Sequence, residues 1–344
     1  MISSPAFQEF IHSTDFLSVL GLPSDKDLSF TPLGQGEYNT NYRFTHPKTG
    51  KELVLRINTG SQMHLSDQIG YEFSALKTLE GCGRTPRAHF CDGSKQILPY
   101  GVLVMEWLPG RALQYERDLC TAAEILADIH AVPVPNDTAL LHPDFPLQSI
   151  YEECLSMVEY YFHWEKASPA VCRLLESMID EIGRRPLKST ASAAPCIVNT
   201  ELNSGNFLIN ENGPSYLIDW EKPILSEPSQ DLGHFLVPTT TFWKTDVILT
   251  PEEIRTFTAH YISAVAGRFD TSEISERLPL YFSTTCLRGV TWCAMAMVEY
   301  STPGRAIINA DTFRKIRQYL EEDFLRNILE KYMRRNFLAQ ENNR

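Results

Sequence analysis

CIVNTELNSGNFLINENGPSYLIDWE, residues 196–221, is the most informative stretch of this chain. Two apolar runs, 207–209 and 216–218, lie on either side of Asn212-Gly213. Asn-Gly between apolar runs favours a two-residue turn, because both residues tolerate the positive φ that such turns require. The stretch therefore predicts a β-hairpin.

Three oxygen-bearing side chains flank this hairpin. Glu201 and Asn206 precede its first strand, and Asp219 follows its second strand. Because the outer ends of a hairpin lie side by side, we expect the three side chains to converge on one point. Mg²⁺ takes a few such oxygen ligands and leaves its other positions to water and phosphate oxygens. The spacing therefore predicts a magnesium site.

The segment resembles the catalytic segment of the aminoglycoside phosphotransferase and choline kinase group of small-molecule kinases, which are relatives of the protein kinases. In that group the segment runs roughly His-Gly-Asp-Leu-His-Pro-Gly-Asn-Ile-Leu and is followed by Ile-Asp-Trp. Asn206 matches the asparagine that holds a metal ion, and Asp219 matches the aspartate that bridges metal and nucleotide phosphates. The resemblance implies ATP (or GTP) and Mg²⁺ as cofactors, and phosphoryl transfer to a hydroxyl as the reaction.

The same resemblance implies the fold class. We expect an α+β, two-lobed protein-kinase-like fold, with a small antiparallel β lobe that contains one helix and a larger, mostly helical lobe. On this reading residues 1–106 form the nucleotide-binding lobe, which begins with a helix over residues 5–22. Residues 107–344 form the helical lobe, with the hairpin and the substrate cleft.

Two residues of the catalytic segment depart from the family pattern. Glu201 stands where the catalytic aspartate is expected, and Asn199 stands where the histidine two residues earlier is expected. A carboxylate at 201 can accept or orient the proton of a substrate hydroxyl. Asn199 cannot titrate, so it could replace the histidine only as a hydrogen-bonding brace.

A glycine-containing run lies between two strand-like runs, 28–33 and 41–44. It reads GQGEYNT, residues 34–40, and Gly34 and Gly36 would let backbone N–H groups approach an anion closely. By itself this pattern is most often a plain turn. Together with the hairpin it predicts a loop that covers nucleotide phosphates.

Arg56 and Glu72 form a candidate ion pair. Arg56 lies in the alternating run 52–57, which predicts a strand, and the resemblance implies that a basic residue there contacts the α and β phosphates. Glu72 lies on a predicted helix over 64–80 and would pair with Arg56, as the helix glutamate of the family does. The alternatives are a solvated strand-end cation and an ordinary exposed acid.

The lobes would be joined by Met105 to Gly110, which follow two more strand-like runs, 87–91 and 102–106. These runs complete a predicted sheet of about five strands. The resemblance implies that the linker meets the adenine through backbone groups, near Glu106 and Trp107. The Trp107 ring could equally be a packing residue.

Helical periodicity dominates the rest of the chain. The pattern becomes helical from residue 115, with an apolar stripe over 122–130, and we expect further helices near 149–165, 169–184, 250–267, 274–300 and 311–335, and a frayed tail at 340–344. His130 has no second histidine at helical spacing, so it is interpreted as a packed helix-end residue. Asp231 matches an aspartate that, in the resembled family, braces the active-site loops.

Composition limits the class of protein. The chain has 344 residues, 43% of them hydrophobic, and a formal net charge of −12, which argues against nucleic-acid binding and mildly favours cationic acceptors. Its eight cysteines form no C-x-x-C pair, so we expect reduced thiols. The absence of a leader or a long apolar span predicts a cytoplasmic protein without membrane contacts.

The sequence leaves the reaction open among three alternatives. The first is an ATP- and Mg²⁺-dependent kinase acting on a small, cationic or polyhydroxy, alcohol. The second is a kinase-fold protein that binds nucleotide and metal but transfers nothing, and the third transfers a nucleotidyl group to a protein. Four acids could face a cationic acceptor or simply solvent: Glu152, Glu153, Glu159 and Glu227. The P-loop, G-x-S-x-G and H-E-x-x-H signatures are absent from the sequence.

Overall fold

A computed structural model describes residues 2, 4–36, 38–61, 63–302 and 310–334. The chain forms two compact units. The first comprises residues 1–113, 132–141 and 206–223, and the second comprises residues 114–131, 142–205 and 224–344. The contacts thus group residues 206–223 with the N-terminal residues, whereas the boundary predicted from sequence placed everything after residue 106 in one lobe.

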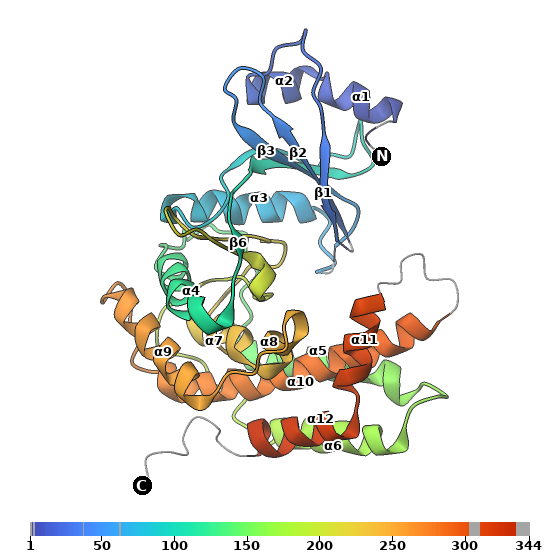
Figure 1. Cartoon of the computed structure of the whole chain (residues 1–344), viewed down its shortest axis with the longest axis vertical. Coiled ribbons are helices and arrows are strands. Elements are labelled where there is room, and N and C mark those ends of the chain that lie inside the picture. Colours follow the sequence, from blue (N-terminus) through green and yellow to red (C-terminus); the bar gives the residue numbers. More distant parts are fainter. Residues whose placement is uncertain (1, 3, 37, 62, 303–309, 335–344) are drawn as a thin grey trace. The chain divides into compact units, whose positions relative to one another are not determined.

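The first unit is built on a five-stranded antiparallel sheet (Figure 1). Its strands stand in the order β1-β2-β3-β5-β4. Their bounds are β1 Thr31–Gln35, β2 Asn39–Thr45, β3 Glu52–Asn58, β4 Ala88–Asp92 and β5 Gly101–Glu106. All five predicted strands are present, with ends shifted by a few residues.

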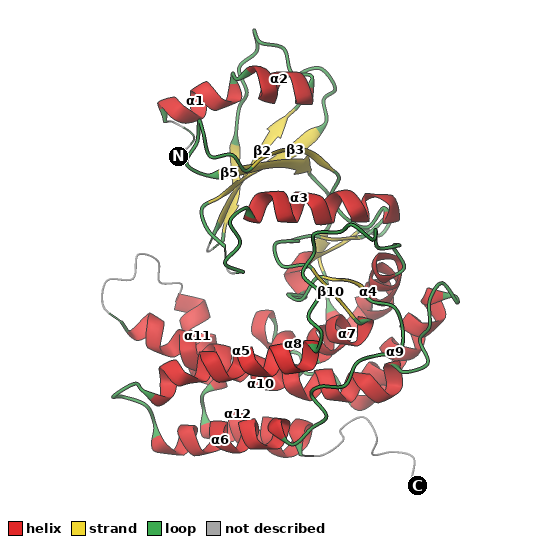
Figure 2. Cartoon of the chain, turned by 180° about the vertical axis from the view of Figure 1, so that it is seen from behind, coloured by secondary structure: helices red, strands yellow, loops and turns green. Residues whose placement is uncertain are grey.

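Helices cover both faces of this sheet (Figures 1 and 2). Helix α3 (Gln68–Leu79) lies on one face, and the 3₁₀ turn η1 (Glu80–Cys82) follows it. Helices α1 (Pro5–Ile11) and α2 (Thr14–Leu20) lie on the other face. The single helix predicted over 5–22 is therefore wrong, because the side chain of Ser13 caps a new helix by accepting a hydrogen bond from the amide of Phe16.

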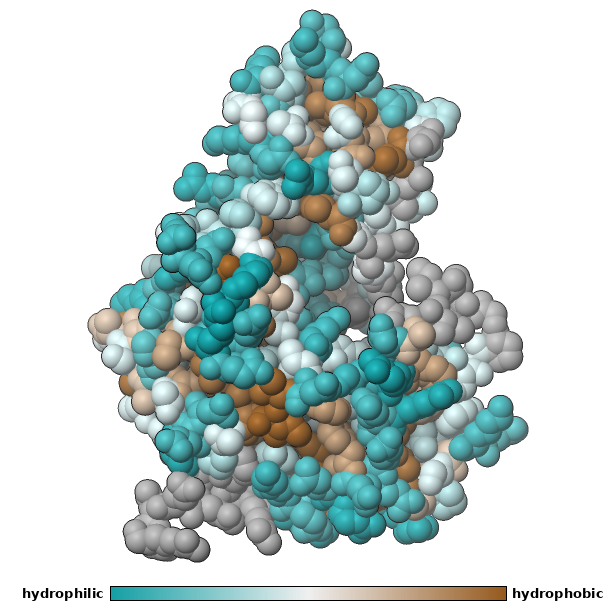
Figure 3. Space-filling view, viewed as in Figure 1, coloured by the Kyte–Doolittle hydropathy of each residue, from teal (hydrophilic) through white to brown (hydrophobic). Residues whose placement is uncertain are grey.

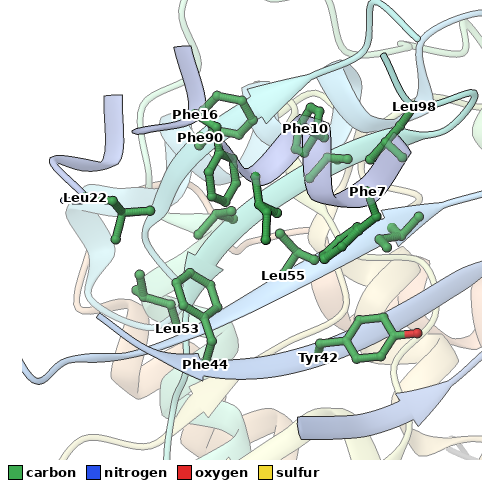
Figure 4. Close-up of a cluster of buried hydrophobic side chains, with 14 residues drawn as sticks. Phe7, Phe10, Phe16, Leu22, Tyr42, Phe44, Leu53, Leu55, Phe90 and Leu98 are labelled. Atoms are coloured by element: carbon green, nitrogen blue, oxygen red, sulfur yellow. The ribbon is translucent and has the colours of Figure 1, made fainter. Parts of the chain in front are cut away.

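An aromatic-rich core joins α1 and α2 to the sheet (Figure 4). Its members include Phe7, Phe10, Phe16, Phe44 and Phe90. Every second residue of β3 also belongs to it, namely Leu53, Leu55 and Ile57. Because side chains alternate along a strand, the intervening Arg56 points to the α3 face. The apolar pattern of β3 thus sets the direction of its one arginine.

A small three-stranded sheet completes the first unit, with β6 (Arg111–Ala112), β8 (Phe207–Ile209) and β9 (Tyr216–Leu217) in that order. Strands β8 and β9 form the predicted hairpin. The predicted two-residue turn is wrong, because residues 210–215 all lie between the strands and Gly213 lacks the positive φ of a type I′ turn. Instead, the hydroxyl of Ser215 accepts a 2.9 Å hydrogen bond from the amide of Asn210.

The second unit is mainly helical (Figure 2). The 28-residue helix α10 packs against α5 and α7, and the short strands β7 and β10 pair antiparallel. The bounds of these elements are α4 Tyr115–His130, α5 Pro146–Phe162, α6 Pro169–Gly183, β7 Cys196–Val198, η2 Ser204–Asn206, β10 Ile224–Ser226, α7 Pro228–Leu236, α8 Pro238–Lys244, α9 Pro251–Val265 and α10 Ile274–Ser301.

The final predicted helix, 311–335, is interrupted. It consists of α11 (Ala310–Tyr319), α12 (Glu322–Asn327) and a π-helical segment (Ile328–Met333). The break falls at Glu321, whose backbone is extended. Residue 335 and the predicted frayed tail, 340–344, lie outside the described residues.

The surface is polar over most of the face seen in Figure 3, with smaller apolar areas between the polar side chains. All eight cysteines are free thiols. Within the described ranges, no helix combines the length and the apolar character needed to cross a bilayer.

Candidate active site

Arg56 is the centre of a polar cluster in the first unit. Its Nη1 donates a 2.6 Å hydrogen bond to Oε1 of Glu72, and its Nη2 lies 3.3 Å from Oδ1 of Asp219. Its Nε donates a 3.0 Å hydrogen bond to the side chain of Asn41. Arg56 is 5% exposed and Glu72 is 1% exposed. The predicted pair therefore forms, and the alternatives of a solvated cation and an exposed acid are wrong.

Burial and charge act in opposite directions on this pair. Burial alone would lower the pKa of Arg56, but the carboxylates of Glu72, Asp219 and Glu221 together hold it above its ordinary value. Burial raises the pKa of Glu72, and Arg56 opposes that shift. One guanidinium thus faces three acidic side chains, which leaves an excess of negative charge when all three are ionised.

Asn206 and Asp219 lie together at the open end of the hairpin. The backbone carbonyl of Asn206 accepts a 2.9 Å hydrogen bond from the amide of Ile218, so the residue next to Asp219 is directly opposite Asn206. Asp219 has a left-handed backbone with φ 67°, and its side chain is one-third exposed. An amide oxygen, an accessible carboxylate and excess negative charge nearby are what a magnesium ion would require. The ligand types therefore fit the expected metal, and the role of these two residues in holding it stays a prediction.

The glycine loop turns tightly between β1 and β2. The amide of Gly36 donates a 2.8 Å hydrogen bond to the carbonyl of Asn39. A Cβ atom added to Gly34 would meet no atom within 4 Å, and one added to Gly36 would meet only the Asn39 carbonyl, at 3.7 Å. Neither glycine has positive φ. They leave open space beside the loop; Glu37 lies outside the described residues.

The linker after β5 is held by backbone contacts within the first unit. The amide of Glu106 donates to the carbonyl of Arg87, and the amide of Trp107 donates to the carbonyl of Glu52. The guanidinium of Arg43 lies 5.0 Å from the centre of the Trp107 ring, which gives that ring a packing partner. The role of Glu106 and Trp107 beside a nucleotide base stays a prediction.

Asp231 organises a second polar cluster, which lies in the second unit. Its two carboxylate oxygens accept hydrogen bonds from the amides of Asn199 (2.8 Å) and Thr200 (2.9 Å). Nε2 of His130 lies 3.3 Å from Asp231, and Nδ1 of His130 lies 2.8 Å from the hydroxyl of Tyr261. Asp231 is fully buried and His130 is 3% exposed. Asp231 braces this loop, and His130 is the packed helix-end residue that the sequence indicated.

The braced loop carries Glu201. The side-chain oxygen of Asn199 accepts a 3.1 Å hydrogen bond from the amide of Glu201, as expected for a brace that cannot titrate. Thr200, between them, has φ 68°. A β-branched residue with a left-handed backbone is a conformational outlier, which is typical of functional loops.

Comparison with known proteins decides the family. The model of the phosphotransferase enzyme family matches residues 29–272, which is most of the chain. The chain belongs to the phosphotransferase enzyme family. No curated protein sequence matches it significantly.

Solved structures of phosphotransferase family members have the same fold. The choline kinase of Streptococcus pneumoniae is 18% identical, with 93% of this chain and 99% of that chain covered and a TM-score of 0.59. The ethanolamine kinase of Plasmodium vivax is 14% identical, with 91% and 88% covered and a TM-score of 0.58. A spectinomycin phosphotransferase solved with ADP and spectinomycin is 14% identical, with 94% and 97% covered and a TM-score of 0.57.

The acids considered for a cationic acceptor differ in their surroundings. Glu227 is buried, accepts a 2.6 Å hydrogen bond from the hydroxyl of Tyr281 and forms an ion pair with Arg277. Glu153 forms a two-point ion pair with Arg288 on α10, and the Glu201 carboxylate contributes to raising the pKa of Arg288. Glu227 and Glu153 are thus each already paired with an arginine.

Sequence reasoning missed the polar residues that hold the segment after Asp219. Glu221 accepts a 2.6 Å side-chain hydrogen bond from Asn39, and its carbonyl accepts a 2.7 Å hydrogen bond from Gln68. The hydroxyl of Tyr71 donates to the carbonyl of Pro223 at 2.5 Å. No sequence pattern indicated these contacts.

Proposed function

We propose that this chain transfers a phosphoryl group from magnesium-bound ATP or GTP to a hydroxyl of a small molecule. The observation that carries the proposal is the buried Arg56, which is joined to Glu72 on α3 and to Asp219 after the hairpin. An arginine is costly to bury unless its charge is used or paired. Here Arg56 lies beside the accessible carboxylate of Asp219. A nucleotide-phosphate site needs such a cation for the phosphates next to a carboxylate for the metal ion.

On the nucleotide side, the residues of the first unit would have separate tasks. Arg56 would donate to phosphate oxygens, the open backbone at Gly34 and Gly36 would admit the phosphates, and the linker at Glu106 and Trp107 would meet the base. Asn206 and Asp219 would hold the magnesium ion. When bound, that ion neutralises charge on the transferring phosphoryl group.

On the acceptor side, Glu201 would take or orient the proton of the attacking hydroxyl. Asn199 would act through Glu201, because its side chain holds the Glu201 amide. Such braces matter because misplacement of a reacting group by about 1 Å can lower the rate about a hundredfold. Glu153 and Glu227 are each already paired with an arginine, so neither would neutralise a cationic acceptor. A polyhydroxy acceptor is therefore favoured over a cationic one.

The test is a transfer assay with radiolabelled ATP or GTP, magnesium and a panel of polyhydroxy and amino alcohols. We expect a labelled product with at least one acceptor, and loss of that product in Glu201→Gln and Asp219→Asn. Nucleotide binding in Glu201→Gln should match the wild type. Binding of magnesium nucleotide without transfer to any acceptor would favour a non-catalytic nucleotide-binding protein. If millimolar magnesium nucleotide gave no thermal stabilisation, both functions would be wrong.

A further inference from the structure

Asn39 occupies a singular place in the first unit. It is the first residue of β2, near the end of the glycine run 34–40, and its backbone carbonyl closes the turn by accepting the 2.8 Å hydrogen bond from Gly36. Its side chain is 4% exposed. A buried amide side chain at the edge of a phosphate loop needs polar partners, because an unpaired one would be costly.

The partners of Asn39 fix the orientation of its amide. Its Nδ2 donates a 2.6 Å hydrogen bond to Oε2 of Glu221, and its Oδ1 accepts a 2.8 Å hydrogen bond from Nδ2 of Asn58. An ionised carboxylate can only accept, so the nitrogen of Asn39 must face Glu221 and the oxygen must face Asn58. The direction of both hydrogen bonds, from Asn58 to Asn39 and from Asn39 to Glu221, is therefore fixed by the ionised carboxylate.

Glu221 belongs to the same segment as the proposed metal ligand Asp219. The intervening Trp220 is buried, and its indole donates to the carbonyl of Leu217. Gln68, from the first turn of α3, holds the Glu221 backbone through a 2.7 Å hydrogen bond. Hydrogen bonds thus hold both Trp220 and Glu221. Because Asp219 is only two residues away, a shift of Glu221 would also move Asp219.

We propose that Asn39 is a positioning residue, which sets the glycine loop and the Asp219–Glu221 segment in register through one buried amide. The inference rests on the proposed function, because it assigns these two segments to one nucleotide site. Asn39 touches neither phosphate nor metal on this proposal. Its backbone holds the loop and its side chain holds the segment.

The hydrogen bond between Asn39 and Glu221 can be tested by exchanging the amide and the carboxylate between the two positions. In Asn39→Asp two carboxylates would meet where one hydrogen bond stood, so the segment would be displaced and nucleotide affinity should fall about tenfold to a hundredfold at neutral pH. Adding Glu221→Gln to Asn39→Asp restores a donor opposite an acceptor, and Asn58 keeps its acceptor.

The experiment measures binding of magnesium with a non-hydrolysable ATP analogue by calorimetry at neutral pH, with thermal unfolding as the check on folding. The proteins are the wild type, Asn39→Asp, Glu221→Gln and the double variant. We expect the double variant to bind within about threefold of Glu221→Gln, whereas Asn39→Asp alone binds weakly at neutral pH.

Two results would overturn the inference alone: wild-type affinity in Asn39→Asp, or a double variant as weak as Asn39→Asp. A wild type that binds no nucleotide would overturn the proposed function and the inference together. If Asn39→Asp fails to fold, Asn39→Ala replaces it, since it keeps the backbone bond to Gly36 and loses only the side-chain bonds. Asn39→Ala with a normal melting temperature and normal nucleotide affinity would then reject the positioning role.

Discussion

Thr200 donates its backbone amide to a carboxylate oxygen of Asp231, 2.9 Å away, while its own backbone is left-handed with φ 68°. The same aspartate holds the amide of Asn199. Because Asp231 is fully buried, these bonds are shielded from competing water. They maintain a conformation that threonine alone would avoid, and they do so one residue before Glu201.

The first prediction is that Thr200→Gly stabilises the protein. A non-glycine residue in a sparsely populated backbone region costs about 1–3 kcal/mol, and glycine accepts positive φ without that cost. Glycine loses more freedom on folding, by about 0.5–1 kcal/mol, so the expected net gain in the free energy of unfolding is about 1 kcal/mol. Urea denaturation of the two proteins measures it.

Thr200→Ala provides the control for that prediction. It removes the β-branch but keeps the Cβ atom, so it should fall between the wild type and Thr200→Gly. A free energy of unfolding that is lower in Thr200→Gly than in the wild type would mean that the threonine side chain contributes more than the backbone strain removes.

The second prediction concerns the Arg56–Glu72 pair. Removing one partner of a buried ion pair leaves an uncompensated charge and typically costs about 3–5 kcal/mol. We therefore expect Arg56→Met and Glu72→Leu each to lower the free energy of unfolding strongly. The double variant should lose less than the sum of the two, because neither member of the pair is then left buried without its partner.

A double-mutant cycle by chemical denaturation measures this coupling. The exposed pair Arg314 and Asp311 on α11 is a suitable control, since surface pairs contribute about 0–1 kcal/mol. Additive losses at Arg56 and Glu72 would show that the two side chains do not act as a pair in solution. All three variants at these positions should lose nucleotide binding whether or not they are stable.

The third prediction concerns the thiols. Cys120 is exposed, whereas Cys154, Cys196, Cys286 and Cys293 are buried. Burial raises the pKa of each of these four thiols and blocks the approach of a reagent, so they should react with Ellman's reagent only after unfolding. The fastest phase at pH 8 should disappear in Cys120→Ser. Rapid reaction of a buried thiol in the folded protein would contradict the packing around α10.

The fold was largely predictable because its signals are local. Alternation predicted β3, and helical periodicity predicted helices such as α6 and α9, whose N-caps are Ser168 and Thr250. The two helix errors occur where the backbone leaves the helix within a periodic run. Ser13 divides the leading helix, and Glu321 divides the last one. Periodicity continues across both points, so the pattern alone could not reveal the breaks.

The site was predictable only where a pair is common to the family. The Arg56–Glu72 pair followed from the resemblance, but Asn39 with Glu221 joins residues 182 positions apart, and no spacing rule connects them. The left-handed backbone of Thr200 was also unpredictable, because threonine disfavours that region and only the hydrogen bonds to Asp231 maintain it. Long-range polar contacts of this kind become evident only in the folded structure.

The last prediction tests whether the loop is built for glutamate at 201. Glu201→Asp withdraws the carboxylate by about 1.5 Å, one carbon–carbon bond, and the loop that carries it is held by the Asn199 side chain and by Asp231. On the proposed function, kcat should fall about a hundredfold, while the KM for nucleotide and the melting temperature stay near wild-type values. Glu201→Gln, which keeps the length and removes the base, should lower kcat about 10²–10⁴-fold. Steady-state kinetics with the acceptor found in the transfer assay separates these cases. A Glu201→Asp variant as fast as the wild type would show that the loop adjusts to either acid, and that its bracing does not fix the position of the carboxylate.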